Sequence, residues 1–216
     1  MTVEKISVII IDDHPVIRHG VTSVLKKQSD MSVVGESHNA DAALPEIKKL
    51  QPDVAILDIT MAGISGIDLI PHIKIHSENT AIVIYSMHQT PDYIHRAFKA
   101  GAKGYVLKGD EISELITAIR DVKEGRSYLS RNLPPALFHQ ILSGKGEDEP
   151  LSILTTREYE IANLLTQSMT PDEIGEMLFI SPKTVRVHRT NIMHKLGCHR
   201  ANELLLRLRD YFPFIK

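Results

Sequence analysis

The feature that most constrains the fold is an alternation, repeated five times in the first 124 residues, of short apolar runs and amphipathic stretches. The apolar runs are rich in β-branched residues and too short for helices: Ile6–Ile11, Ser32–Val34, Val54–Leu57, Ala81–Tyr85 and Tyr105–Leu107. Such runs are typical of strands buried on both faces. The stretches of helical length are Val16–Lys27, Ala40–Leu50, Gly66–His76, Pro91–Ala100 and Ile112–Lys123. The alternation predicts an α/β fold with a doubly wound, five-stranded parallel sheet.

A change of pattern after residue 125 predicts a second domain. We expect a first domain at 1–125, a linker at 126–150 and a small all-α domain at 151–216. The linker contains the polar run GKGEDEP and a possible short helix around Leu133 to Leu142. Beyond it, capping and Pro signals open successive helices at Thr155, Thr170 and Ser181, and a Leu-rich stretch from Asn202 to about Tyr211 predicts a fourth.

Polar side chains stand at the ends of four of the five predicted strands. They are Asp12 and Asp13, Asp58, Ser86 and Lys108. Ligands bind outside the carboxyl ends of parallel strands, so these groups are expected to meet there. Three carboxylates at one edge repel each other, and a divalent cation such as Mg²⁺ relieves that repulsion. One carboxylate could then accept a phosphoryl group, with Lys108 supplying positive charge and Ser86 a hydroxyl.

Each of these residues also has an ordinary structural interpretation. An isolated Asp at a strand end is most often a turn or cap residue, and an isolated Lys is most often solvated. The ordered set of strand-end groups favours a functional role for Asp13, Asp58 and Lys108. For Tyr105 a core role and a switch role both stay open, and His14 is interpreted as a helix-start residue rather than a ligand.

Residues 4–124 closely resemble the response-regulator receiver family. The residues that carry the resemblance are Asp12-Asp13, Asp58 in VAILDITM, Ser86 in IVIYSMH and Lys108 in AGAKGYVLKG. The resemblance implies the strand order 2-1-3-4-5, which sets the ends of the first and third strands side by side.

The resemblance also implies roles for the site residues. Asp58 would be the phosphoacceptor, and Mg²⁺ would be held by Asp13, Asp58 and the main-chain carbonyl of Thr60, with Asp12 acting through water. Lys108 and Ser86 would bind the phosphoryl group, and Tyr105 matches the aromatic switch residue of the family.

In the switch that the family implies, Ser86 moves toward the phosphate and Tyr105 turns inward. One departure from the family is Ala62, where Pro is usual, and it bears on the lifetime of the phosphate.

The last third of the chain contains a basic helix. Between residues 182 and 200 there are five basic side chains and no acidic one, although the whole chain carries a net charge of −2. Charge alone leaves a solvated helix face and an anionic partner equally open. The second and third predicted helices are separated only by Phe179–Ser181, as in a helix-turn-helix. A basic third helix of this kind fits the major groove of DNA.

Residues 151–208 resemble the LuxR/NarL-type DNA-binding domain. The matches are L-T-x-R-E at Leu154–Glu158, E-I at Glu173–Ile174 and S-P-K-T-V-x-V-H at Ser181–His188. The residues that would face bases are Arg186, Val187 and Thr190. Those that would contact phosphates are Lys183, Thr184, Arg189 and Lys195.

Two roles in this domain stay open at the level of sequence. Val187 could pack in the core instead of facing DNA. The last helix resembles the dimer helix of the family through Leu204, Leu205 and Leu208, but it could equally be only core.

Together the two resemblances predict a two-component response regulator and transcription factor. A sensor histidine kinase or a small phosphodonor would phosphorylate Asp58 with Mg²⁺, and a homodimer would then bind inverted half-sites on double-stranded DNA. We expect no turnover enzyme. A phosphatase of the aspartyl-phosphate type would want a second Asp at position 60, which is Thr, and no P-loop pattern is present. A receiver that is never phosphorylated and acts as an interaction module is the second alternative.

The predicted location is cytoplasmic. A single cysteine, Cys198, excludes an internal disulfide and fits a reducing compartment. The N-terminus lacks the pattern of a signal peptide, and no apolar run approaches the ~18 residues of a membrane span, so no membrane partner is expected.

Overall fold

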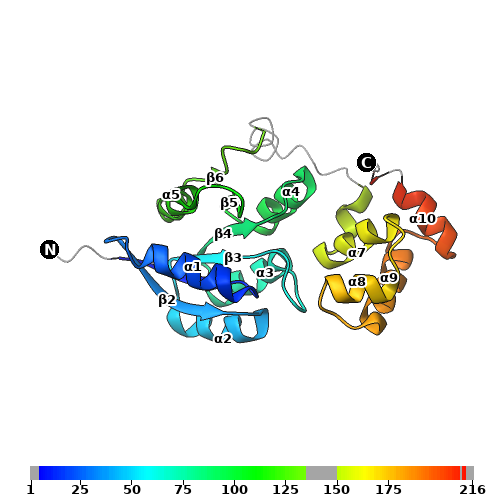
Figure 1. Ribbon diagram of the computed structural model, residues 1–216, viewed down its shortest axis with the longest axis horizontal. Coiled ribbons are helices and arrows are strands. Elements are labelled where there is room, and N and C mark those ends of the chain that lie inside the picture. The colour runs from blue at the N-terminus through cyan, green and yellow to red at the C-terminus, as the bar shows by residue number, and fades with distance from the viewer. Residues whose placement is uncertain (1–4, 135–149, 210, 213–216) are drawn as a thin grey trace. The chain divides into compact units, whose positions relative to one another are not determined.

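The computed structural model describes residues 5–134, 150–209 and 211–212. The chain divides into two compact units, residues 1–146 and 147–216, and each is described by itself (Figure 1). No helix in the described part of the chain combines the length and apolar character needed to cross a membrane.

The first unit contains a parallel sheet in the order β2-β1-β3-β4-β5-β6. Its strands are β1 (Ile6–Ile11), β2 (Met31–Ser37), β3 (Val54–Leu57), β4 (Ala81–Ser86), β5 (Gly104–Leu107) and β6 (Tyr128–Leu129). Its helices are α1 (Pro15–Leu25), α2 (Ala40–Leu50), α3 (Gly66–His76), α4 (Pro91–Ala100) and α5 (Ile112–Lys123). The doubly wound parallel fold and the order of the first five strands are confirmed.

The prediction of five strands was wrong by one. β6 pairs in parallel with β5 in the register Gly104 to Tyr128 and Tyr105 to Leu129. Ser130 extends this contact, because its backbone N–H donates to the Tyr105 carbonyl at 2.9 Å. A strand of two residues has no measurable periodicity, which is why the sequence pattern missed it. The expected linker at 126–150 therefore starts within the sheet, and the expected short helix lies outside the described residues except for its first two positions.

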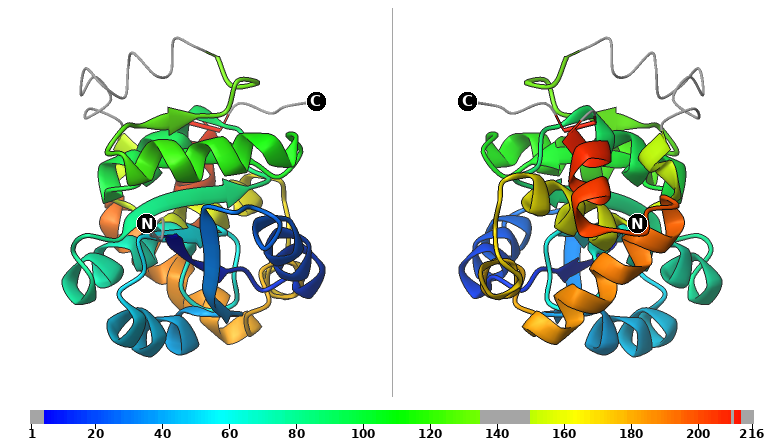
Figure 2. Two further views of the ribbon diagram at one scale, coloured as in Figure 1. Left: turned by 90° about the vertical axis from the view of Figure 1, so that its left-hand side faces the viewer. Right: turned by 90° about the vertical axis from the view of Figure 1, so that its right-hand side faces the viewer.

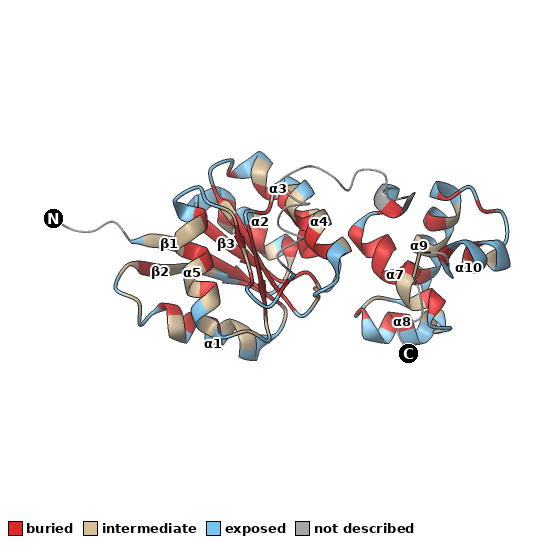
Figure 3. Cartoon of the chain, turned by 90° about the horizontal axis from the view of Figure 1, so that it is seen from above, coloured by how far each residue is buried: buried red, intermediate tan, exposed pale blue. Residues whose placement is uncertain are grey.

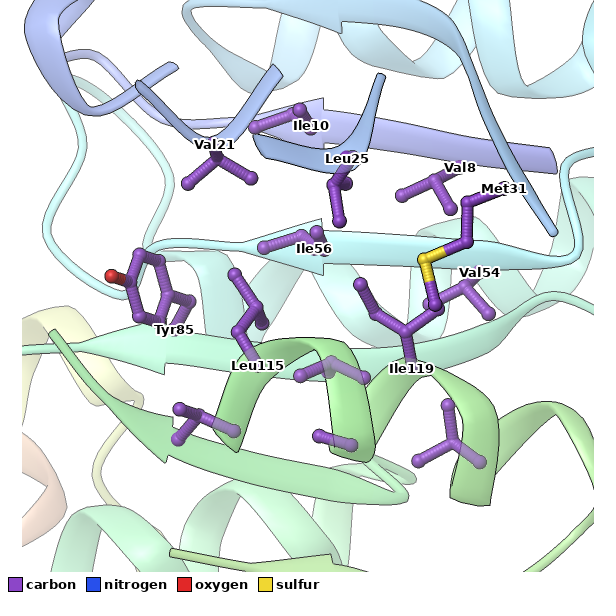
Figure 4. Close-up of a cluster of buried hydrophobic side chains, with 14 of the residues drawn as sticks. Val8, Ile10, Val21, Leu25, Met31, Val54, Ile56, Tyr85, Leu115 and Ile119 are labelled. Carbon is purple, nitrogen blue, oxygen red and sulfur yellow. The ribbon is translucent and has the colours of Figure 1, made fainter. Parts of the chain in front are cut away.

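Helices cover both faces of the sheet (Figures 1 and 2). α1 and α5 cover one face, where Val21, Leu25, Leu115 and Ile119 pack with strand residues such as Ile56 (Figure 4). α2, α3 and α4 lie against the other face, with α3 between its two neighbours. β3 and β5 are buried along their whole length, as the apolar runs predicted (Figure 3). This packing fixes where the strands end, and so positions the groups that follow them.

The second unit is helical. Its elements are η1 (Pro150–Ile153), α7 (Thr156–Thr166), α8 (Pro171–Met177), α9 (Pro182–Lys195) and α10 (Ala201–Arg209). The Thr155 hydroxyl accepts from the N–H of Glu158, whose carboxylate accepts from the N–H of Thr155, so the predicted capping box is confirmed. The α8–α9 turn places Phe179 at φ 52°, a left-handed conformation that a bulky residue rarely adopts.

Candidate phosphoryl and DNA-binding sites

The strand-end groups of the first unit meet at one edge of the sheet. Ile11 and Leu57 are register partners at the ends of β1 and β3, and the N–H of Asp58 donates to the Ile11 carbonyl at 2.9 Å. Asp12 and Asp58 therefore leave neighbouring strands together. Segments distant in sequence meet here because the carboxyl ends of parallel strands share one edge of the sheet.

Lys108 joins the two carboxylates that lie deepest in the site. Its Nζ lies 2.8 Å from Asp12 Oδ2 and 2.7 Å from Asp58 Oδ2. All three side chains are at most 5% exposed. An ammonium that arrives from β5 thus neutralises carboxylates from β1 and β3, as the order of the strand-end groups predicted.

Asp13 and His14 complete a group of possible cation ligands. Ligand atoms of Asp12, Asp13, His14 and Asp58 all lie within 4.8 Å of one another. The His14 Nδ1 is 2.7 Å from Asp13 Oδ1 and 3.3 Å from Asp12 Oδ1. Three carboxylates facing one ammonium leave an excess of negative charge, and oxygen donors of this kind suit a hard divalent cation. The donor set therefore fits Mg²⁺.

His14 lies closer to the site than the sequence suggested, although it is the residue before α1 as expected. A second basic group was missed altogether. The Arg18 guanidinium, one turn into α1, donates to the Asp12 carbonyl at 2.6 Å. No sequence signal marks Arg18, since a charged residue on an amphipathic helix is usually solvated.

Burial dominates the electrostatics of Asp58. It raises the pKa of the Asp58 carboxyl from 3.8 to about 6, although Lys108 opposes that rise, and the negative charge of Asp12 adds to it. The N–H of Ile59 donates to Asp58 Oδ1 at 2.8 Å, which leaves Oδ2 against Lys108. Burial also disfavours the charged form of Lys108, but Asp58 and Asp12 outweigh it, so the pKa of Lys108 is raised. The ammonium is therefore retained at neutral pH.

Gly66, at the first position of α3, is a site residue that the sequence did not reveal. A Cβ on Gly66 would lie 1.8 Å from the Asp58 carbonyl oxygen, far inside van der Waals contact. The Gly66 N–H and the Ser65 hydroxyl both donate to the Ile59 carbonyl, at 3.0 and 3.2 Å. The β3–α3 loop thus closes tightly under the phosphoacceptor candidate, and only glycine allows that approach.

The predicted switch residues lie on neighbouring strands, Ser86 at the end of β4 and Tyr105 on β5. Ser86 is fully buried, and its hydroxyl accepts from the N–H of His88 at 3.3 Å. Tyr105 is also fully buried, and its hydroxyl donates to the His88 carbonyl at 2.7 Å. Tyr105 therefore already lies inward. Burial, with the charge of Asp58 adding to it, raises the pKa of Tyr105, so the hydroxyl keeps its proton.

His88 was not singled out in the sequence. Its Nε2 shares a hydrogen bond of 2.8 Å with Thr60 Oγ1, and its ring stacks on Tyr93 of α4 at 4.1 Å. Burial, followed by the charge of Lys108, lowers the pKa of His88, so the ring is neutral at physiological pH. Contacts between loops 28 residues apart leave no local pattern that could have found it.

In the second unit α9 carries the predicted DNA-contacting side chains. Ser181 caps the helix by accepting from the N–H of Thr184 at 3.1 Å. The predicted contact residues that are exposed are Lys183, Arg186, Val187, Thr190 and Lys195, and those that are half-buried are Thr184 and Arg189. Val187 is 53% exposed, so the core alternative does not hold for it. The apolar stripe of α9 is formed instead by Val185 and Ile192, which are buried.

Two of the predicted contact residues have acidic neighbours. Lys195 Nζ donates to Glu158 Oε2 at 2.6 Å, so it ties the end of α9 to the capping box of α7. Arg186 and Asp172 approach only to 3.9 Å and both are exposed, which makes that pair weak. Arg186 is thus available to an anionic partner, whereas Lys195 would have to give up an existing bond.

The leucines of α10 separate into core and surface. Leu204 and Leu208 are buried within the second unit, so the core alternative that the sequence left open holds for both. Leu205 is half-buried, and Leu206, which the sequence analysis passed over, is 65% exposed. A partner on this helix would therefore meet Leu205 and Leu206 rather than the two buried leucines.

Both units match known families. Residues 8–120 match the response regulator receiver domain, and residues 152–208 match the bacterial regulatory proteins of the luxR family. The chain therefore belongs to the response regulators that combine a receiver domain with a LuxR-type helix-turn-helix domain.

Two of the similar proteins span nearly the whole chain, and a third spans about two thirds of it. The chain is 35% identical over 204 residues to the oxygen regulatory protein NreC of Staphylococcus aureus, and the match covers 92% of this chain and 94% of NreC. RcsB of Salmonella enterica serovar Typhimurium, solved with promoter rprA and the phosphomimetic BeF₃⁻, is 26% identical with a TM-score of 0.60, covering 98% and 100% of the two chains. A LuxR-family regulator from Aurantimonas sp. is 30% identical with a TM-score of 0.58, covering 65% and 98%.

Proposed function

We propose that Asp58 is the phosphoacceptor of this response regulator and that its phosphorylation controls operator binding by α9. The observation that carries the proposal is the position of Lys108 Nζ, within 2.8 Å of both Asp12 and Asp58. A histidine kinase or a small phosphodonor supplies the phosphoryl group. An Asp58 carboxylate oxygen attacks phosphorus, the bond to the donor breaks, and an acyl phosphate forms.

The surrounding residues position and neutralise that group. Lys108 moves its ammonium from the carboxylate to the phosphoryl oxygens, and Ser86 donates its hydroxyl to one of them. Mg²⁺ would be held by Asp13, Asp58 and the Thr60 carbonyl, with Asp12 acting through water, and it offsets the negative charge of the transferring phosphoryl group. Asp58 must be ionised to attack, and a cation at these oxygens favours that form.

Regulation rather than turnover follows from the family. Each protein molecule is modified once per signal, and the acyl phosphate is lost by slow hydrolysis at Asp58. Thr60 occupies the position where a phosphatase of this type would need a second acid, so we expect that hydrolysis not to be accelerated by a group at this position. Because the acting partners are a phosphodonor and DNA, we place the protein in the cytoplasm.

For DNA binding we propose that α9 enters the major groove. Arg186, Val187 and Thr190 would face base edges, while Lys183, Thr184, Arg189 and Lys195 would contact phosphates. A homodimer would present two such helices to inverted half-sites roughly one helical turn apart. The exposed part of α10 at Leu205 and Leu206 is the surface we assign to the second copy.

The test is phosphorylation by acetyl phosphate, read by intact mass, with operator binding measured in parallel. We expect a single phosphoryl adduct that needs Mg²⁺, is absent from Asp58→Asn and is retained in Asp68→Asn, which changes a carboxylate on α3. An adduct that persists in Asp58→Asn, or DNA binding that ignores the adduct, would contradict the proposal. Many turnovers of acetyl phosphate per protein molecule would favour a phosphatase instead.

A further inference from the structure

His88 is the point at which four parts of the first unit meet. Its N–H donates to Ser86 Oγ, and its carbonyl accepts from the Tyr105 hydroxyl at 2.7 Å. Its ring shares a 2.8 Å hydrogen bond with Thr60 Oγ1 and stacks on Tyr93 with an interplanar angle of 20°. One residue thus connects the β3–α3 loop, the end of β4, the middle of β5 and the first turn of α4.

The side chain of His88 anchors a loop that has little other packing. Met87, its neighbour, is 72% exposed and contributes no apolar anchor. Tyr93 is buried in α4, so the face on which the His88 ring stacks belongs to the folded core. The hydrogen bond to Thr60 and the stack on Tyr93 therefore hold the ring from two sides, and the ring in turn determines where the His88 backbone lies.

Tyr105 depends on that backbone. A buried hydroxyl without an acceptor is strongly unfavourable, and the His88 carbonyl is the acceptor of the inward Tyr105. If the carbonyl moves, the inward Tyr105 loses this acceptor and is left with its side-chain hydrogen bond with Ser86. The contact between His88 and Thr60 also reaches the phosphoacceptor candidate, because Thr60 is two residues beyond Asp58 in the same loop.

We propose that His88 is a positioning residue for the Tyr105 switch. Through Thr60 and Tyr93 its side chain holds the carbonyl that the inward Tyr105 requires, and it couples that carbonyl to the loop of Asp58. The inference rests on the proposed function and on the switch that the family resemblance implies, in which an inward Tyr105 accompanies phosphorylation. Removing the side chain moves the equilibrium toward outward Tyr105 and makes the phosphorylated protein a weaker regulator.

The test measures the position of Tyr105 directly, by fluorine NMR of the full chain labelled with 3-fluorotyrosine, with Mg²⁺ and beryllofluoride. The chain has six tyrosines, and the signal of Tyr105 is the one lost in Tyr105→Phe. His88→Phe keeps an aromatic ring for stacking and removes the hydrogen bond. Thr60→Val removes the same bond from the other side and keeps the main-chain carbonyl. His95→Ala, on α4, is the matched control.

We expect each of His88→Phe and Thr60→Val to lower the ratio of inward to outward Tyr105 by roughly threefold to tenfold, the effect of losing one net hydrogen bond. The double variant should lower it no further, because both changes remove the same bond. His95→Ala should behave as wild type. The bound beryllofluoride signal shows in each variant that the protein is folded and that the site is occupied.

Three outcomes would overturn the inference. In the first outcome, His88→Phe and Thr60→Val bind beryllofluoride but keep the wild-type ratio of inward to outward Tyr105. That result would contradict this inference and leave the proposed function intact. In the second outcome, the effects of the two changes add fully in the double variant. That result would also contradict this inference alone, because the two changes would then not remove the same hydrogen bond between His88 and Thr60. A wild-type chain that binds no beryllofluoride overturns the proposed function, and this inference with it.

Discussion

Replacing Asp58 by Asn should make the metal-free protein more stable at neutral pH. Burial raises the pKa of Asp58 from 3.8 to about 6, so the ionised carboxylate is less favourable in the folded state than in the unfolded chain. At about 1.4 kcal/mol for each pKa unit, the ionised carboxylate costs roughly 3 kcal/mol of folding free energy. Asn has the shape of the neutral acid and cannot ionise, and Lys108 keeps Asp12 as a partner in the variant.

The pH dependence has a definite sign. A group whose pKa is raised on folding stabilises the fold below its unfolded pKa and loses that contribution as the pH rises through its folded pKa. The difference in free energy of unfolding between Asp58→Asn and wild type should therefore grow between pH 3.8 and about pH 6 and stay constant above that range. Urea unfolding in the presence of a chelator, followed by far-UV circular dichroism at about pH 8 and about pH 4.5, measures it. Adding Mg²⁺ should stabilise wild type and narrow the gap.

Asp53 supplies the matched control, since it is another carboxylate beside β3. Burial acts to raise the pKa of Asp53, but its bonds to Lys123 and Ser7 outweigh burial and lower it. Asp53→Asn should accordingly destabilise the protein at about pH 8, opposite in sign to Asp58→Asn. An Asp58→Asn protein that is less stable than wild type, or a gap of equal size at both pH values, would refute the reasoning.

Three further substitutions test other parts of the molecule. Gly66→Ala should lower the free energy of unfolding by several kcal/mol and slow phosphorylation, because its Cβ would lie 1.8 Å from the Asp58 carbonyl oxygen. The control is Gly109→Ala, whose Cβ meets nothing within 4 Å and which should be neutral. Urea unfolding and intact-mass measurements compare the two variants. Arg186→Ala should weaken binding to the operator more than to random DNA, by about 1–3 kcal/mol. Lys183→Ala should weaken both alike and lower the salt slope by about 1, and equal behaviour of the two variants in salt titrations would contradict that division.

The fold and the centre of the site could be predicted because both depend on local pattern. Buried parallel strands are continuous apolar runs, and the polar residue that ends each run lies at the shared edge whatever the details of packing. Asp12, Asp58 and Lys108 were found in this way, and in the structure Lys108 lies within hydrogen-bond distance of both carboxylates.

The parts that could not be predicted depend on contacts between distant segments. Gly66 reads in sequence as an ordinary loop or helix-start glycine, and only the path of the β3–α3 loop shows that a Cβ would strike Asp58. His88 matters because of Thr60 and Tyr105, which come from two other elements. For Leu204 the sequence left a dimer role and a core role open, and its burial is decided by how α10 packs on α7.

The stability argument for Asp58 bears on how the proposed switch works. The resting site keeps a buried carboxylate whose ionised form is disfavoured, beside Asp12 and Asp13 and with a single ammonium to balance them. A cation and a phosphoryl group each bring new partners for Lys108, Ser86 and these oxygens. Binding and modification therefore gain more free energy here than they would in a site whose charges were already balanced. The charge of Asp58 acts on Tyr105, whose hydroxyl donates to the His88 carbonyl, so the proposed switch residue lies within reach of the group whose charge changes.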